Sequence, residues 1–269
     1  MATVSSSTPM ALASVSSPKD CAATKFGSRL RGHLRGRLRE SMVLAVAASV
    51  YFGGRVLVEG GVVESAKNAQ RLVDLEQMLG VDIELAVHEF ALRHETVRVV
   101  GNLSYVWLHW PLLLSSLWFL FAVDRKRYLQ LRNAMFLSGL VGLVLFATFP
   151  MAPPRFMPGF VGTVSDEARR HHLDYPLSWT NQFAAFPSFH VGWTLITCVA
   201  VASSLRHPSW RWFALIPAAM VSLAVISTAN HYVIDATVGG TIAVLAYWWF
   251  GRSQRRWTVG VGHDGQPIS

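Results

Sequence analysis

The stretch VVGNLSYVWLHWPLLLSSLWFLFAV, residues 99–123, contains no charged residue. Because a helix rises about 1.5 Å per residue, about 20 apolar residues cross the ~30 Å hydrocarbon core of a bilayer. Further apolar runs of nearly this length lie at 41–58, 132–149, 187–205, 211–228 and 232–250. We therefore expect an all-α fold, an integral membrane six-helix bundle. The run 41–58 is the weakest of the six, because Arg55 lies near its end.

The composition favours a membrane protein over a soluble one. Apolar residues make up 52 % of the chain and charged residues 15 %, and the mean hydropathy is +0.33. The net charge of +8 comes from short basic clusters between apolar runs. Such clusters suit anionic lipid headgroups, so we expect the membrane, and no nucleic acid, as a partner. Cys21 and Cys198 indicate no disulfide or zinc framework.

The basic residues also predict the topology. If the N-terminus is inside, the inner segments are 1–40, 124–132, 205–211 and 251–269, and they hold 16 of the 24 Lys and Arg residues. The outer segments, 59–98 and 150–186, hold seven. Because inner loops carry an excess of Lys and Arg, this distribution predicts a multi-pass protein of the cell membrane with both termini inside.

We expect a disordered, basic cytoplasmic tail at 1–40, a six-transmembrane-helix catalytic domain at 41–250 and a polar cytoplasmic tail at 251–269. The composition of 1–40 also fits a transit peptide, so a targeting role for this segment stays open. The first outer segment, 59–98, contains apolar residues at helical spacing with acidic residues between them. This pattern predicts amphipathic helices on the membrane surface. The residues at this spacing are Leu72, Leu75, Leu79, Ile83, Ala86 and Phe90.

One polar motif lies where the second outer segment enters an apolar run, in NQFAAFPSFH at 181–190. Pro187 suits the first turn of a helix. The backbone N–H groups of Ser188 and Phe189 would then be unpaired and would form an anion site for phosphate. His190, on the same turn, could donate a proton there. The alternative is a helix cap with an interfacial histidine.

A second polar motif, NHYVIDATVGG at 230–240, enters the last apolar run. His231 and Asp235 are spaced i, i+4 and share one helix face. A carboxylate beside an imidazole fixes its tautomer and makes the free nitrogen more basic. Ionisable residues at this depth of a membrane are costly and usually functional. The alternative is a His–Asp pair that only joins two helices.

A third motif, PMAPPR at 150–155, follows the third apolar run, and its Arg155 could contact phosphate oxygens with two parallel hydrogen bonds. The alternative is an arginine that meets lipid headgroups. The predicted topology places all three motifs on the outer face. A phosphate anchor, a proton donor and an oriented histidine in one region indicate phosphoryl transfer.

The segment FPSFH, followed some forty residues later by HYVID, resembles the second and third signature motifs of the type 2 phosphatidic acid phosphatase superfamily. Together with PMAPPR, the motifs are most similar to its inositol phosphorylceramide synthase-like branch, over about 100–250. The resemblance implies a six-helix membrane bundle with its active site at the outer face. It implies that His231 is the nucleophile that forms a phosphohistidine and that Asp235 orients it. His190 would protonate the leaving group, and Arg155 and the Ser188 region would hold phosphate.

The sequence departs from the family pattern at several positions. Ala224 and Val225 stand where the third motif usually has Ser-Arg, and Phe189 replaces the usual glycine of the second motif. Arg155 is followed by Phe156, and the lysine of the first motif has no match. The phosphate site is therefore short of cations, which puts plain lipid phosphatase activity in doubt.

A candidate for the missing charge lies in the second apolar helix. Arg98, Asn102, Tyr105 and His109 are spaced 4, 3 and 4 residues apart and form one polar stripe. Polar groups at that depth should face the bundle interior. We expect Arg98, Tyr105 and His109 to bind substrate, with His109 nearest to the acceptor. Interhelical hydrogen bonding is the alternative for Asn102 and Tyr105.

The sequence thus predicts a lipid phosphatase or phospho-head-group transferase that acts on a lipid phosphate or phospholipid. Histidine supplies the nucleophile, so we expect neither a cofactor nor a metal. A non-enzymatic transporter or scaffold with a buried polar path is the alternative, although six helices without internal repeats are a poor transporter pattern. The lipid donor, the acceptor (water, inositol or another hydroxyl) and the oligomeric state do not follow from the sequence.

Overall fold

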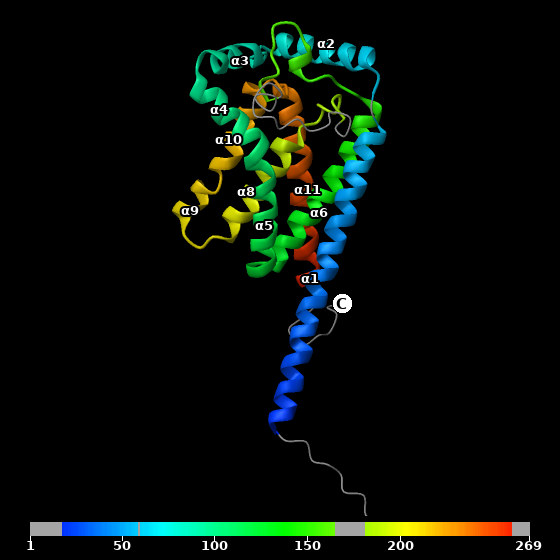
Figure 1. Ribbon diagram of the computed structural model, residues 1–269, viewed down its shortest axis with the longest axis vertical. Coiled ribbons are helices and arrows are strands. Elements are labelled where there is room, and N and C mark those ends of the chain that lie inside the picture. Colours follow the sequence, from blue (N-terminus) through cyan, green and yellow to red (C-terminus); the bar gives the residue numbers. More distant parts are fainter. Residues whose placement is uncertain (1–17, 59, 165–180, 260–269) are drawn as a thin grey trace, which may run out of the picture. The chain divides into compact units, whose positions relative to one another are not determined.

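The structure is a computed structural model that describes residues 18–58, 60–164 and 181–259. It divides into two compact units, Met1–Ser49 and Val50–Ser269. Every named element in the described residues is helical (Figure 1). These elements are α1 (Pro18–Leu57), α2 (Val62–Leu79), α3 (Glu84–Arg93), α4 (Glu95–Leu103), the π-helix η1 (Ser104–Leu108), α5 (His109–Val123), α6 (Arg125–Thr148), the 3-10 helix η2 (Pro154–Phe156), α8 (Phe189–Ser204), α9 (Pro208–Phe213), α10 (Ile216–Ser227) and α11 (Val233–Val259).

Five helical segments of the described chain are long and apolar enough to cross a membrane. They are Arg35–Leu57, Glu95–Val123, Arg125–Thr148, Pro208–Ser227 and Val233–Ser253. Helix α8 is apolar but has only 16 residues. The all-α integral membrane fold expected from the sequence is therefore confirmed, while the count of six crossing helices stays a prediction.

Two helices continue beyond the apolar runs that predict them. Helix α1 begins at Pro18, although we expected a disordered tail as far as residue 40. Proline suits the first turn of a helix, and no further proline occurs between Pro18 and Pro111. Helix α11 runs to Val259 and takes in half of the expected polar tail at 251–269.

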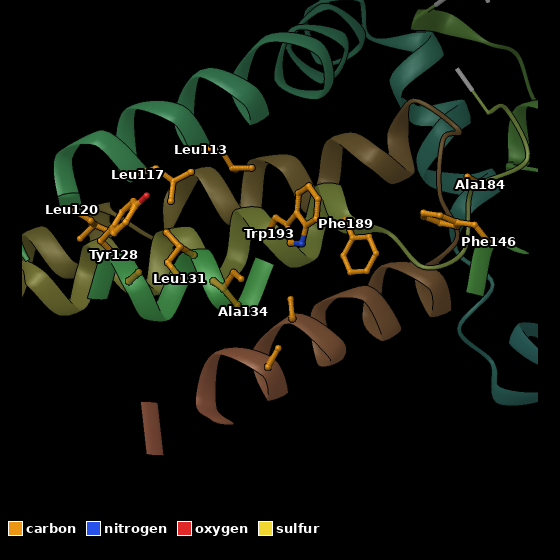
Figure 2. Packing of buried hydrophobic residues seen from close by; sticks show 14 residues of the cluster. Leu113, Leu117, Leu120, Tyr128, Leu131, Ala134, Phe146, Ala184, Phe189 and Trp193 are labelled. Atoms are coloured by element: carbon orange, nitrogen blue, oxygen red, sulfur yellow. The ribbon is translucent and has the colours of Figure 1, made fainter. Parts of the chain in front are cut away.

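In the unit Val50–Ser269, α8 is the central helix and packs against α5, α6, α10 and α11. The largest hydrophobic cluster fills the space around it with side chains of α5, α6, α8 and α11. Figure 2 shows the rings of Phe189 and Trp193 side by side in this cluster, with their centroids 5.3 Å apart. Helix α8 is thus fixed on several sides, and its first turn carries Phe189 and His190.

Helices α8 and α11 approach each other closely because glycine lies at their contact. A Cβ atom on Gly239 would come within 2.1 Å of the carbonyl oxygen of Ser188, and one on Gly192 within 2.4 Å of the carbonyl oxygen of Gly239. Small residues of this kind let two membrane helices pack backbone against backbone. Gly239 of the NHYVIDATVGG motif therefore contributes the contact that brings the two polar motifs together.

Helices α2 and α3 lie across one end of the bundle (Figure 1). Both helices lie within 59–98, and their position on a membrane surface stays a prediction. Ala69 and Leu72 of α2 are buried, whereas Leu75 and Leu79 are exposed. The amide of Asn68 donates a hydrogen bond of 2.9 Å to the carbonyl oxygen of Pro150 and ties α2 to the third motif.

Candidate active site

His231 lies in the short connection between α10 and α11, whose backbone is firmly held. The N–H groups of Asn230 and His231 both donate to the carbonyl oxygen of Val225, at 3.1 Å. Ala229 adopts a left-handed conformation with φ of 55°. A residue with a Cβ pays about 1–2 kcal/mol for this conformation, and such positions occur often at functional sites.

The contacts of the His231 ring decide which of its nitrogens carries the proton. Nδ1 lies 3.0 Å from the carbonyl oxygen of Ala185 and 3.3 Å from Oδ2 of Asp235. The carbonyl oxygen of Ala185 can only accept a hydrogen bond, so the nitrogen that faces it must be a donor. The proton therefore resides on Nδ1, and Nε2 keeps its lone pair for chemistry. The i, i+4 pairing of His231 with Asp235 that the sequence predicts is present.

Asp235 joins the two motifs. Its side chain is fully buried, and its backbone oxygen accepts a hydrogen bond of 3.0 Å from the N–H of Ser188. We expected this Ser188 N–H to be unpaired and available to phosphate, and that expectation is wrong. The close approach of α8 and α11 supplies the partner. The Ser188 hydroxyl is fully buried and has no hydrogen-bond partner among the described groups, so it can donate to a ligand.

Helix α8 begins at Phe189 with Ser188 as its N-cap, so Pro187 precedes the helix and does not lie in its first turn as we expected. The Phe189 side chain points into the hydrophobic cluster: it packs against Phe146, with ring centroids 6.3 Å apart, and into the space that Gly142 leaves open. Its backbone N–H makes no hydrogen bond to another described residue. Phe189 can therefore offer an anion its N–H group but not its ring.

His190 is half-buried beneath two other rings. Tyr105 stacks on it at 4.5 Å between centroids, and His109 lies at the same distance with a tilt of 37°. The π-helix η1 contains Tyr105 and ends just before His109. Insertions of this kind are frequent at functional sites, because they re-aim side chains within a helix. The His190 and His231 ring centroids are 6.0 Å apart, so a phosphate group can reach both rings.

The predicted polar stripe of the second span divides into two parts. Tyr105 and His109 reach His190, and His109 Nδ1 also contacts the Thr194 hydroxyl at 2.7 Å. Asn102 instead bonds the Thr163 hydroxyl through Oδ1 at 2.9 Å and packs between segments. Arg98 lies 3.7 Å from Glu95 in an ion pair. Arg98 and Asn102 therefore make contacts within the protein and do not reach His190 as Tyr105 and His109 do.

Arg155 lies beside His231. Its Nη1 donates a hydrogen bond of 2.6 Å to the side-chain oxygen of Asn230, and its backbone N–H donates to Ala229. The guanidinium group is half-buried and has other N–H donors in its planar fork. The structure thus brings Arg155 next to the loop that carries His231, as the motif predicts.

Sequence reasoning missed Arg55. Its Nε is buried without a hydrogen-bond partner, and its guanidinium carbon lies 5.3 Å from the Phe146 ring centroid. The side-chain amide of Asn181 donates to the carbonyl oxygen of Arg55 at 2.9 Å, which ties Arg55 to the start of the NQFAAFPSFH motif. Arg55 was a usable signal, because a charge inside an apolar run is functional by default.

Sequence reasoning also missed Glu76 and Glu84, which are almost fully buried beside the start of α11. Burial, opposed by a hydrogen bond from Ile234 and reinforced by the neighbouring charge of Glu84, raises the pKa of Glu76 to about 8. Glu76 follows Leu72 by four residues, on the buried face of α2, where an acidic side chain breaks the apolar pattern. In the part of the chain that the structure describes, no cluster of His, Cys, Asp and Glu side chains could hold a metal ion.

Comparison with known proteins supports the family resemblance of the motifs that form this site. Residues 70–249 match the sequence profile of the PAP2 superfamily, which confirms the resemblance drawn from the motifs. The phosphoinositol dihydroceramide synthase of Bacteroides thetaiotaomicron is 27 % identical over 179 residues. This match covers 60 % of the present chain and 58 % of the relative, and it supports the inositol phosphorylceramide synthase-like branch. No solved structure matches the chain.

Proposed function

Because this chain belongs to the PAP2 superfamily, we propose that it is a membrane enzyme that cleaves a lipid phosphate ester through a phosphohistidine and transfers the phosphate-bearing group to a hydroxyl acceptor. One observation carries the proposal. His231 Nδ1 contacts only hydrogen-bond acceptors, so Nε2 is the unprotonated nitrogen of a buried, oriented ring. Such a nitrogen is a nucleophile that needs no further activation.

The reaction follows from this arrangement. His231 Nε2 attacks phosphorus, and the bond from phosphorus to the leaving alkoxide breaks. His190 gives the alkoxide a proton, which a poor leaving group requires. An acceptor hydroxyl then gives its proton to His190 and attacks phosphorus, which frees His231. Asp235 stabilises the positive charge that His231 gains.

The phosphate oxygens need donors that are in place before the reaction. The Ser188 hydroxyl and the Phe189 N–H offer two, and the Arg155 guanidinium group, beside the loop that carries His231, contributes a positive charge. Arg55 supplies the further positive charge that the family motifs lack in this chain. Tyr105 and His109, stacked on His190, lie where the leaving or accepting alcohol must reach the proton.

The test of this chemistry is a trapped intermediate. The purified protein is mixed with phosphatidic acid or phosphatidylinositol labelled in the phosphate, and acid-labile, base-stable label on the protein is measured. Wild type should carry the label, and His231→Ala should not. Product analysis with and without ceramide or inositol then separates transfer from hydrolysis, since both share the first half-reaction. The name of the bacterial relative, a synthase, supports transfer.

We also propose that six helices cross the membrane and that both termini lie inside, with the site at the outer face. The distribution of Lys and Arg supports this topology. In a cysteine-free background, Val161→Cys should react with an impermeant reagent in sealed right-side-out vesicles, and His207→Cys should not. Equal labelling at both positions contradicts the outer site.

A further inference from the structure

The first turn of α11 is capped by side chains from distant parts of the chain. A helix leaves its first N–H groups without partners, and a residue just before the helix normally caps them. Here Glu84 Oε1 accepts from the Val233 N–H and Glu76 Oε1 accepts from the Ile234 N–H, each at 2.7 Å. The two carboxyl groups come from α3 and α2, 149 and 158 residues away along the chain.

Both carboxyl groups are buried, with Glu76 at 0 % and Glu84 at 3 % exposure. Leaving two carboxylates together in such a place is costly unless they share a proton or pair with a cation. The second oxygen of Glu76 is buried and has no hydrogen-bond partner among the described groups. Burial and the neighbouring Glu84 raise the pKa of Glu76 to about 8, so Glu76 keeps its proton at pH 7.

The capped residues, Val233 and Ile234, lie between the two reacting residues in the chain. His231 precedes Val233 by two residues, and Asp235 follows Ile234. Any shift of this turn moves the Asp235 carboxylate relative to the His231 ring, and their contact of 3.3 Å leaves little room for a shift. A misplacement of about 1 Å at a reacting group can cost about 100-fold in rate.

We propose that Glu76 and Glu84 are positioning residues of the reaction, which cap α11 and thereby hold His231 and Asp235 in the geometry of phosphoryl transfer. This inference rests on the proposed function. It assigns the surface helices α2 and α3 a part in catalysis, although neither contributes a group that touches the phosphate.

The proton of Glu76 gives this role a pH signature. The titratable groups that face Glu76 are Glu84 of α3, Asp235 of α11, and Tyr232 just before α11. Burial raises the pKa of Tyr232 above its usual value, so Tyr232 stays neutral. When Glu76 ionises above pH about 8, its new negative charge lies beside the carboxyl groups of Glu84 and Asp235. Turnover should therefore fall as pH rises through this value.

The experiment uses full-length protein in detergent with p-nitrophenyl phosphate, whose leaving group needs little help from a general acid. Glu76→Gln keeps a carbonyl oxygen for the Ile234 N–H and an N–H for Glu84, but it cannot ionise. It should keep wild-type kcat at pH 7 within about threefold and lose the fall above pH 8. Glu76→Ala should lose about 10- to 100-fold in kcat with little change in KM, since the buried hydrogen bond that holds the Ile234 N–H is lost and the turn can shift.

Glu89→Gln is the matched control, because Glu89 lies on the same helix as Glu84 but is exposed. It should leave kcat and the pH profile unchanged. The positioning role is overturned if Glu76→Gln keeps the wild-type fall above pH 8 or if Glu76→Ala keeps wild-type kcat. Should Glu76→Ala fail to fold, the Glu76→Gln profile decides alone.

A second readout does not depend on activity. Hydrogen–deuterium exchange of the first turn of α11 should become faster in Glu76→Ala and stay at the wild-type rate in Glu89→Gln. Unchanged exchange in Glu76→Ala overturns the cap. If His231→Ala is as active as wild type, the proposed function fails instead, and the exchange data still decide whether Glu76 fixes the turn.

Discussion

The two histidines of the site lie 6.0 Å apart between ring centroids, but they are held in different ways. The His231 ring is 6 % exposed, and its Nδ1 is bonded to a backbone carbonyl and a buried carboxylate. The His190 ring is half-buried, and stacked rings hold it without a side-chain hydrogen bond to another described residue.

This difference matches two chemical tasks. A nucleophile needs one nitrogen in one place, so every contact that fixes the ring contributes to the rate. A general acid has to release a proton to one oxygen and take one back from another, so a hydrogen bond that locks its proton would hinder it. The substitutions below are chosen to break or sharpen this contrast.

The largest effect is expected at His231. His231→Ala should lose turnover of both phosphatidic acid and p-nitrophenyl phosphate by on the order of 10⁴-fold or more, because no other residue can form the covalent intermediate. Trapped acid-labile phosphoenzyme and steady-state rates measure this loss. A His231→Ala protein that still forms phosphoenzyme would assign the nucleophile to His190.

Asp235→Asn should follow, with a loss of about 10³- to 10⁴-fold. The amide can present an N–H to His231 Nδ1, which moves the ring proton to Nε2 and removes the lone pair. Turnover of p-nitrophenyl phosphate measures the loss, and a circular dichroism spectrum checks that the helices persist. Wild-type turnover in Asp235→Asn would show that Ala185 alone fixes the tautomer.

His190→Ala should separate the two tasks by substrate. Lipid turnover should fall by about 10²- to 10⁴-fold, because an alkyl alkoxide leaves poorly without a proton. Turnover of p-nitrophenyl phosphate should change much less, and phosphoenzyme should still form. An equal loss on both substrates would mean that His190 serves the phosphate rather than the leaving group.

The His231 pair and its motif partners could be predicted from sequence because their geometry is local. An i, i+4 spacing places His231 and Asp235 on one face wherever the helix lies. The apolar runs predict the helices for the same reason, since each run is a local property of the chain. The exact helix ends could not be predicted, because α1 and α11 continue as helices through the polar residues that flank their apolar runs.

The surroundings of the pair could not be predicted, because they depend on packing between distant segments. The Ser188 N–H reaches Asp235 only through the close contact at Gly239. The carboxylates that cap α11 come from helices that look like membrane-surface helices in sequence. In the sequence, Arg55 is only a charged residue within an apolar run, and its contact with Phe146 depends on the fold.

The arginines test this second point. Arg55→Gln should raise the KM for phosphatidic acid by about 10- to 150-fold, as expected for one lost charged contact to phosphate. Arg155→Gln should have a similar effect. Arg98→Gln is the matched comparison, since Arg98 is already paired with Glu95 and should change KM by less than about threefold. A larger effect at Arg98 than at Arg55 would mean that the second span, and not Arg55, supplies the positive charge that binds the phosphate.

The smallest effect expected is on stability, and it comes from the carboxyl pair that holds the His231 side. Glu76 keeps its proton in the folded protein up to pH about 8, whereas the unfolded chain releases it near 4.5. Between these values folding takes up a proton, so the free energy of unfolding falls as pH rises, and above pH 8 it no longer changes for this reason.

The slope is measurable as a thermal midpoint. For one group, the free energy changes by at most about 1.4 kcal/mol per pH unit, which corresponds to roughly 3–6 °C per unit in a chain of this size. Wild type should therefore melt lower at pH 7.5 than at pH 5.5, and Glu76→Gln should flatten that slope. Glu89→Gln should keep it, because Glu89 is exposed and paired with Arg93. If wild type and Glu76→Gln lose stability in parallel over this range, Glu76 is not the group that takes up the proton, and the cap must hold two carboxylates by other means.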